Sequence, residues 1–192
     1  MRFLMLLMVP LLSSSTVTTH LPGDELSRIE IYSAAARQYC VTHHFNSNYF
    51  FFADMHLHSG KNRFFIINMQ NDSIIDAGLV AHGSCGPFFS ATAIFSNEPG
   101  CACSYYGRFK VAGKYAGRFG NAYKLYGLDS SNSNAYKRNI VLHSYYEMPD
   151  NEIYPGHVCN SQGCPMVSKN FLKRLSSYID ASKKPILLWI VN

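Results

Sequence analysis

Short apolar runs separated by turn-forming residues recur along the chain after residue 48, and they predict β-strands. The runs are rich in Phe, Tyr, Ile and Val, which suit the pleated surface of a sheet. Seven of them lie at residues 49–56, 64–68, 73–82, 108–111, 123–126, 140–142 and 186–191. Only short turns separate the first three, so we expect a three-stranded meander. The last run is apolar throughout, and we therefore expect a central strand.

Two other segments repeat apolar residues at helical spacing. One extends to Cys40 with Asp24 as its N-cap, and the other spans residues 169–181 with Ser168 as its N-cap. Residues 83–106 are instead rich in Gly, Pro, Ser and Cys, which predicts an irregular segment with one short strand at 92–95. These elements predict a mainly β, α+β fold with an N-terminal helix and a second helix before the last strand.

The composition suits one folded domain. Of the 192 residues, 47% are hydrophobic and 15% are charged, which allows a sizeable core and argues against a disordered chain. No segment repeats at a fixed period, so a solenoid or a coiled coil is not expected. We predict a single domain over residues 22–192, and the sequence carries no signal for its oligomeric state.

Residues 1–21 have the pattern of a secretory signal peptide. Arg2 precedes an apolar run that is shorter than the ~20 residues needed to span a bilayer, and small polar residues follow at 13–16. Pro10 and the lack of amphipathic spacing argue against the alternative of a buried helix. No later segment could cross a membrane, so we expect an exported protein of the periplasm or cell envelope.

The net charge is +5 at pH 7, without a long run of Lys or Arg. This mild basicity fits an exported protein that works near an anionic polymer, and an ordinary basic surface explains it equally well. It gives no specific indication of nucleic acid, which we do not expect as a partner.

The turn Gly156–Ser168 contains the strongest candidate for chemistry, the thiol of Cys164. Gly163 permits positive φ or a close backbone approach, and Pro165 fixes the exit, so we expect a tight, exposed turn. His143 ends an apolar run and is the candidate base. As a pair they would form a thiolate and an imidazolium, with a lowered thiol pKa and the N–H groups of Gly163 and Cys164 facing an oxyanion. A buried structural thiol and an unrelated strand-end histidine are the alternative.

An exported protein can form disulfides among its other cysteines. If Cys164 is catalytic, an odd number remains, so at least one more thiol is free, buried or bonded to another chain. The remaining five are Cys40, Cys85, Cys101, Cys103 and Cys159. The sequence does not reveal how they pair.

Metal binding is the rival use of the cysteines and histidines. The three close pairs lack a second pair at the separation that zinc sites show, so we expect no metal centre. These pairs are Cys101 with Cys103, His43 with His44, and His56 with His58.

Five short motifs occur in order along the chain. They are Ala81-His82-Gly83, Phe95-Ser96-Asn97, Gly127-Leu128-Asp129, the segment from Asn134 to His143, and Ser161-Gln162-Gly163-Cys164-Pro165. Through these motifs the chain resembles the murein L,D-transpeptidase catalytic-domain family from about Phe50 to the C-terminus. The resemblance implies a β-sandwich-like catalytic domain without a metal or organic cofactor.

The resemblance also implies a reaction on peptidoglycan stem peptides. Cys164 would attack the carbonyl of the L-configured centre of diaminopimelate in a tetrapeptide stem, expel D-alanine and form a thioester, while His143 moves the proton. An amine from a second stem would complete L,D-transpeptidation, whereas water would make the site an L,D-carboxypeptidase. A catalytically silent domain that binds the wall or a metal through the same cleft is the alternative from another class.

Three further motif residues each have two interpretations. His82 would line the acyl-donor pocket or cap a strand. Arg138 would hold a substrate carboxylate or tie loops together, and we favour the second role. Asn97 fits a turn residue better than a ligand.

The chain also departs from the family pattern beside both reacting residues. Residues 144–146 are Ser-Tyr-Tyr where the family has small residues, and Gln162 stands where a related branch has His. The group that orients His143 therefore stays open among Ser144, Ser161 and a backbone carbonyl.

Overall fold

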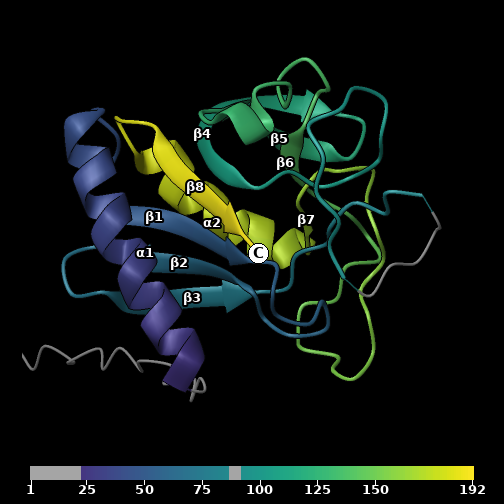
Figure 1. Ribbon diagram of the computed structural model, residues 1–192, viewed down its shortest axis with the longest axis horizontal. Coiled ribbons are helices and arrows are strands. Elements are labelled where there is room, and N and C mark those ends of the chain that lie inside the picture. Colours follow the sequence, from purple (N-terminus) through teal and green to yellow (C-terminus); the bar gives the residue numbers. More distant parts are fainter. Residues whose placement is uncertain (1–22, 87–91) are drawn as a thin grey trace, which may run out of the picture.

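One mixed sheet runs through the molecule, and two helices pack against it (Figure 1). The computed structural model describes residues 23–86 and 92–192, so the signal peptide expected at 1–21 lies outside the described residues. Within the described part the sheet has eight strands in the order β3-β2-β1-β8-β4-β5-β6-β7. Their bounds are β1 Tyr49–Asp54, β2 Phe64–Asn68, β3 Ser73–Gly78, β4 Gly107–Gly117, β5 Gly120–Gly127, β6 Val141–Ser144, β7 Met166–Val167 and β8 Ile186–Val191.

The expected meander and the expected central strand are both confirmed. β1, β2 and β3 pair antiparallel in sequence order. Leu188 of β8 lies opposite Phe51 in a parallel pair with β1 and opposite Phe109 in an antiparallel pair with β4. β8 is thus hydrogen-bonded along both edges and covered on both faces, which is why its sequence is apolar throughout.

The two helices cover opposite faces of the sheet. Successive side chains of a strand point to opposite sides, and Phe50 and Phe52 of β1 pack with helix α1 (Gly23–Thr42), whereas Phe51 belongs to the cluster that contains helix α2 (Lys169–Ala181). Figure 1 shows α1 crossing the front of the β1 to β3 region with α2 behind the sheet. Among the described residues, no helix is long and apolar enough to cross a membrane.

Both predicted helices form, with one difference at the first boundary. The Ser168 Oγ accepts the N–H of Phe171 at 3.1 Å, so the predicted N-cap of α2 is confirmed. α1 begins at Gly23, so Asp24 lies inside the helix instead of capping it.

A strong curvature of the sheet makes the fold sandwich-like. In the strand order, β2 and β6 are separated by four strands, a distance of about 24 Å in a flat sheet. Nevertheless Phe64 of β2 and Leu142 of β6 belong to one continuous core, which Phe171 and Leu175 of α2 fill. The mainly β fold with an N-terminal helix and a helix after Cys164 is therefore confirmed.

Some predicted strand bounds are wrong. No strand forms at residues 92–95, where Phe95 makes only an isolated bridge with Ser104. β3 ends at Gly78, although the apolar run continues to His82. β7 was not expected, because two residues are too few to show alternation. The missed strand matters most, since it begins two residues after Cys164.

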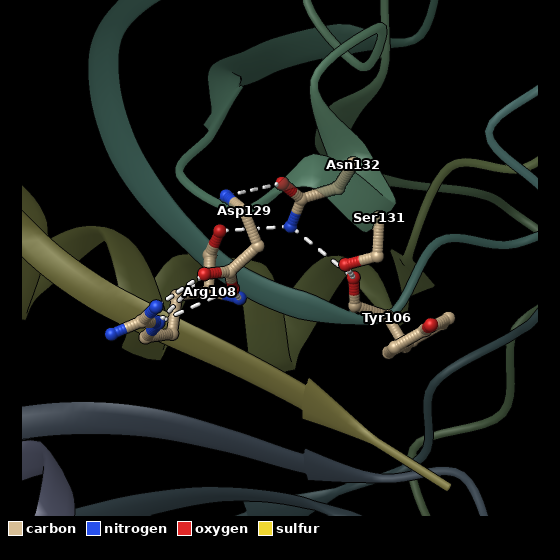
Figure 2. A network of polar contacts seen from close by, with 5 residues as sticks. All are labelled: Tyr106, Arg108, Asp129, Ser131 and Asn132. Carbon is tan, nitrogen blue, oxygen red and sulfur yellow. Dashed lines mark hydrogen bonds and ion pairs between the residues drawn. The ribbon is translucent and has the colours of Figure 1, made fainter.

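A polar turn after β5 ties that strand to β4 (Figure 2). The Asp129 carboxylate accepts the backbone N–H of Arg108 at 2.6 Å and its Nε at 3.0 Å. The buried Asn132 accepts the N–H of Asp129 at 2.9 Å and donates to the carbonyls of Arg108 at 2.9 Å and Tyr106 at 3.2 Å. The acid of the third family motif therefore serves the fold, as part of a turn that includes the 3-10 helix η1 Ser130–Asn132.

Two glycines of the β4–β5 hairpin test how closely this turn packs. A Cβ at Gly127 would overlap the backbone oxygen of Asn132, whereas a Cβ at Gly113 would meet nothing within 4 Å. We expect Gly127→Ala to lower the free energy of unfolding by about 1–3 kcal/mol, because backbone must move. Gly113→Ala should change it by less than about 0.5 kcal/mol. Urea denaturation measures both values, and equal effects would contradict this account.

Candidate active site

The candidate thiol lies on a turn that packs against the loop carrying Cys103. Gly163 has a φ of 109°, as its glycine predicts. A Cβ at this position would come within 2.7 Å of the Cys103 carbonyl oxygen and 3.2 Å of Ile140 Cδ1. Glycine is therefore required both by conformation and by space. Gln162 of this turn is exposed, whereas Cys164 itself is half-buried and packs against the core, so the turn is less exposed at the thiol than expected.

Ser161 shapes this turn and fastens it to the first motif. Its Oγ accepts the N–H of Gly163 at 3.0 Å, and its own N–H donates to the His82 carbonyl at 2.8 Å. Ser161 also forms a parallel bridge with Gly83. Because the Gly163 N–H is already engaged, it is not free to stabilise an oxyanion as expected. Of the two N–H groups considered, the one of Cys164 remains the candidate.

Two backbone groups at the entrance to β6 contact the Cys164 thiol. The N–H of Val141 donates to Sγ at 3.5 Å, and Sγ lies 3.8 Å from the carbonyl oxygen of Asn139. A thiol can accept the first contact and donate its proton to the second. This arrangement suits the neutral form of Cys164.

His143 is held in β6 with one ring nitrogen already engaged. Only 5% of the residue is exposed. Its Nδ1 lies 3.0 Å from the carbonyl oxygen of Ser144, and a carbonyl can only accept, so Nδ1 carries the proton. In the neutral imidazole this leaves Nε2 as the proton acceptor. The orienting group that the sequence left open is therefore the backbone carbonyl of Ser144.

The parallel pairing of β6 with β7 brings the thiol beside the strand of the base. Met166 of β7 lies opposite His143, and Cys164, two residues before Met166, contacts Val141, two residues before His143. Both residues are described, and no hydrogen bond joins them in this structure. Such contacts are often long in enzymes without substrate and shorten in the complex. The arrangement places the thiol against the start of β6, the strand that carries His143.

Burial controls the charge of both groups. Desolvation raises the pKa of the Cys164 thiol, against the smaller lowering effects of the Val141 N–H and the charge of Arg138. Desolvation also lowers the pKa of His143, and the hydrogen bond to Ser144 opposes this only in part. Both shifts favour a neutral thiol beside a neutral imidazole. The expected lowering of the thiol pKa is therefore not found in the free protein.

His82 belongs to a buried network behind the turn. The residue has no exposed surface, and its Nδ1 lies 2.8 Å from a guanidinium nitrogen of Arg63. Arg63 can only donate, so Nδ1 accepts and Nε2 carries the proton. Nδ2 of Asn160 lies 3.1 Å from Nε2, and because both would then donate, the Asn160 amide must be rotated by 180° for its oxygen to accept this proton. This burial favours a structural role of His82 over contact with an acyl donor.

Arg138 and Asn97 each join two loops. The Arg138 guanidinium donates to the Cys101 carbonyl and lies 4.6 Å from the ring centroid of Tyr105. Asn97 Oδ1 accepts the N–H of Asn134 at 3.1 Å, and Asn134 Nδ2 donates to the Asn97 carbonyl at 3.0 Å. These contacts match the structural interpretation that the sequence favoured for both residues.

One disulfide, between Cys85 and Cys103, is present in the described part of the chain. It holds the loop that packs against Gly163. The remaining thiols, those of Cys40, Cys101, Cys159 and Cys164, are free. Of the five cysteines other than Cys164, three are thus unpaired. This agrees with the prediction that at least one of these five has no partner in the chain.

Phe119 is the residue near the site that sequence reasoning missed. It lies between β4 and β5, and its ring stacks on His143 with centroids 5.2 Å apart and an interplanar angle of 16°. Phe119 itself is 46% exposed, so the ring covers the imidazole from the solvent side. The only local sequence signal for this position was Gly120, which indicates a hairpin turn. It does not indicate that the turn contacts His143.

No group of three or more His, Cys, Asp or Glu side chains is placed to hold a metal ion in residues 23–86 and 92–192. The close histidine rings are those of His58 and His157, 4.4 Å apart, a pair that sequence spacing did not predict. His58 Nδ1 accepts the N–H of Gly60 at 3.1 Å, which leaves one nitrogen of that ring for other contacts.

The sequence profile described as the L,D-transpeptidase catalytic domain matches residues 24–188. The chain belongs to this family. The resemblance inferred from the five motifs is thereby confirmed. A search among curated proteins found no match.

Solved structures with a similar chain path are distant in sequence. One is the helical cell shape determining protein Pgp2 from Campylobacter jejuni, with a TM-score of 0.46, 9% identity, and coverage of 74% of this chain and 46% of that chain. Another is the L,D-transpeptidase from Xylanimonas cellulosilytica, with a TM-score of 0.42, 11% identity, and coverage of 80% and 68%. The chain thus spans less than half the length of Pgp2.

We expect Phe119→Ala to raise the pKa of His143 toward the ordinary histidine value, because water then reaches the imidazole. Titration of the His143 ring by NMR measures this shift. Phe119→Leu is the matched control, since a leucine still covers the ring and should leave the pKa closer to that of the unmodified protein. An unchanged pKa in Phe119→Ala would show that other groups cause the desolvation.

We expect Cys164 to react with iodoacetamide only as the pH rises above the ordinary thiol pKa, because the buried thiol loses its proton late. Peptide mass spectrometry follows this site, with an unstructured cysteine peptide as the reference. Arg138→Met should slow the reaction further, since it removes a cation that favours the thiolate. A rate that is already maximal near neutral pH would reveal a preformed thiolate and contradict the prediction.

Proposed function

We propose that this chain is an exported cysteine L,D-transpeptidase that acts on peptidoglycan stem peptides, with Cys164 as nucleophile and His143 as base. The observation that carries the proposal is the pairing of β6 with β7, which sets the thiol beside the strand of the histidine. The hydrogen bond from His143 Nδ1 to Ser144 supports it, because it leaves Nε2 free to take a proton. Membership of the L,D-transpeptidase family supplies the substrate class.

The reaction starts from the neutral pair. His143 Nε2 takes the thiol proton as Cys164 Sγ attacks the carbonyl of the L-configured centre of diaminopimelate in the tetrapeptide stem. The carbonyl oxygen becomes an oxyanion, for which the Cys164 N–H is the candidate donor, since the Gly163 N–H is already engaged. The tetrahedral intermediate then collapses, His143 returns the proton to the leaving amine, and D-alanine departs. A thioester on Cys164 remains.

The amine of a second stem peptide then removes the acyl group from the enzyme. The neutral amine attacks the thioester carbonyl, His143 takes the proton of that amine, and the bond from carbon to Sγ breaks. The proton passes to Sγ, and the thiol is restored with a new amide formed. If water attacks instead of the amine, the product is a free carboxylate and the enzyme acts as an L,D-carboxypeptidase. The same two residues serve both outcomes.

The mechanism makes a prediction about acyl-enzyme formation. Incubation with a tetrapeptide stem or a carbapenem should add one acyl group to the protein, as measured by intact mass. We expect Cys164→Ala to abolish the adduct and His143→Ala to slow its formation by about 10²–10⁴-fold, the usual contribution of a general base. His157→Ala is the matched control, because this histidine is exposed and lies outside the site.

Two outcomes of this experiment would overturn the proposal. An adduct that survives Cys164→Ala would place the chemistry on another residue. The absence of any adduct on the unmodified protein would favour a silent domain that binds the wall without reaction. Circular dichroism of each variant shows whether the fold is kept, so that loss of reaction is not confused with unfolding.

A further inference from the structure

A groove of about 720 Å³ lies beside the end of the strand that carries His143, and it has no role in the mechanism above. Neither Cys164 nor His143 lines it, but Ser144, directly after the base, and Phe119, stacked on the base, both do. Residues from the β4–β5 hairpin form one wall and the first half of α2 forms another. The groove is therefore adjacent to the general base.

The α2 wall of this groove is positively charged. Lys169 and Lys173 are one helical turn apart and both line the groove. Among the described residues, neither lysine forms an ion pair. Lys169 is the first residue of α2, and the Asp150 carboxylate interacts with the N-cap Ser168 just before it. The groove thus offers two ammonium groups that form no ion pair among the described residues.

Nearby acidic groups have other partners. Lys114, on the opposite wall, is paired with Asp180 at 2.8 Å. Asp150 accepts a hydrogen bond from Asn170 Nδ2 at 2.6 Å. Asp180 is thus neutralised by Lys114, whereas Asp150 keeps its charge because its partner is a neutral amide. Neither carboxylate forms an ion pair with Lys169 or Lys173, and these two cations on one wall favour an anionic ligand.

Aromatic and apolar side chains form part of the remaining surface, together with the polar residues Asn121, Asn170 and Ser176. Phe119 and Tyr145 meet edge to face with centroids 5.5 Å apart, and Leu172 lies on the α2 side. An elongated ligand with apolar segments and carboxylates fits such a lining better than a small inorganic anion does. A peptide with several free carboxylates has this chemistry.

We propose that this groove binds the acceptor stem peptide through its carboxylates, with Lys169 and Lys173 as their partners. The inference rests on the proposed transpeptidase function and assigns its second substrate to the His143 side. Two cations hold the carboxylates on the α2 wall and repel the ammonium group of the acceptor, which lowers the pKa of that amine. The amine is thereby more often neutral, the form that attacks the thioester, with His143 next to it to take the proton.

Binding to the intact chain tests the groove without relying on catalysis. The probe is a synthetic stem tripeptide, which lacks the terminal D-alanine and cannot donate an acyl group. We expect Lys169→Met with Lys173→Met to weaken binding about tenfold, the effect of two exposed ion pairs, and added salt to weaken binding to the unmodified protein. Lys169→Arg with Lys173→Arg keeps both charges and should retain most of the affinity.

Lys183→Met with Lys184→Met is the matched control. These lysines are exposed, lie beyond the end of α2, and their removal changes the net charge by the same amount. The control should bind the tripeptide as the unmodified protein does. Equal affinity of the Lys169/Lys173 methionine variant, or an equal loss in the Lys183/Lys184 variant, would overturn the proposal.

Two half-reactions separate this inference from the proposed function. We expect the Lys169/Lys173 methionine variant to form the acyl adduct at an unchanged rate. About tenfold less of the acyl group should pass to the acceptor amine, and hydrolysis should release the remainder as the free carboxylate. If acylation of this variant is also about tenfold slower, the groove binds the donor stem, and the acceptor assignment is overturned. If the unmodified protein forms no adduct, the proposed function fails, and the tripeptide measurement still decides the groove.

Discussion

The two-residue parallel pairing between β6 and β7 is the constraint on which the candidate site depends. It places Met166 opposite His143 and so brings Cys164 against the start of β6, where backbone groups of Asn139 and Val141 contact the thiol. The rest of the fold supports this short contact. The opposite edge of β6 pairs with β5, and the core behind it contains α2. A turn held in this way keeps the thiol and the base on neighbouring strands without a direct bond between them.

Several family motifs serve this geometry from outside the reacting pair. His82 fastens the Cys164 turn through its carbonyl to Ser161 and through its ring to Asn160. Arg138 holds Cys101 of the adjoining loop, and the disulfide fixes Cys103 where it meets Gly163. His82 and Arg138, for which the sequence left both a substrate contact and a structural role open, thus help to build the wall of the site. Their polar groups are largely engaged within the protein.

Burial and charge act on different neighbours of His143. Desolvation raises the pKa of the Cys164 thiol and lowers that of the imidazole, which favours the neutral form of both groups. Phe119 stacks on the imidazole, and the groove that Phe119 helps to line carries the charges of Lys169 and Lys173. In the proposed reaction the thiol would hold the acyl donor and this groove would hold the acceptor.

The sequence by itself determined the elements with long periodic patterns and the chemistry-bearing motifs. The meander, the central strand β8, the capped helix α2 and the need for positive φ at Gly163 follow from residue type and spacing, which act locally. Only the tertiary structure decided which backbone carbonyl orients His143, that Phe119 covers it, that His82 is buried, and which cysteines pair. These depend on contacts between residues far apart in the chain, and local patterns do not encode them. The same reason explains why the pKa of the Cys164 thiol is raised where the sequence predicted that it would be lowered, because the burial of this thiol comes from the assembled core.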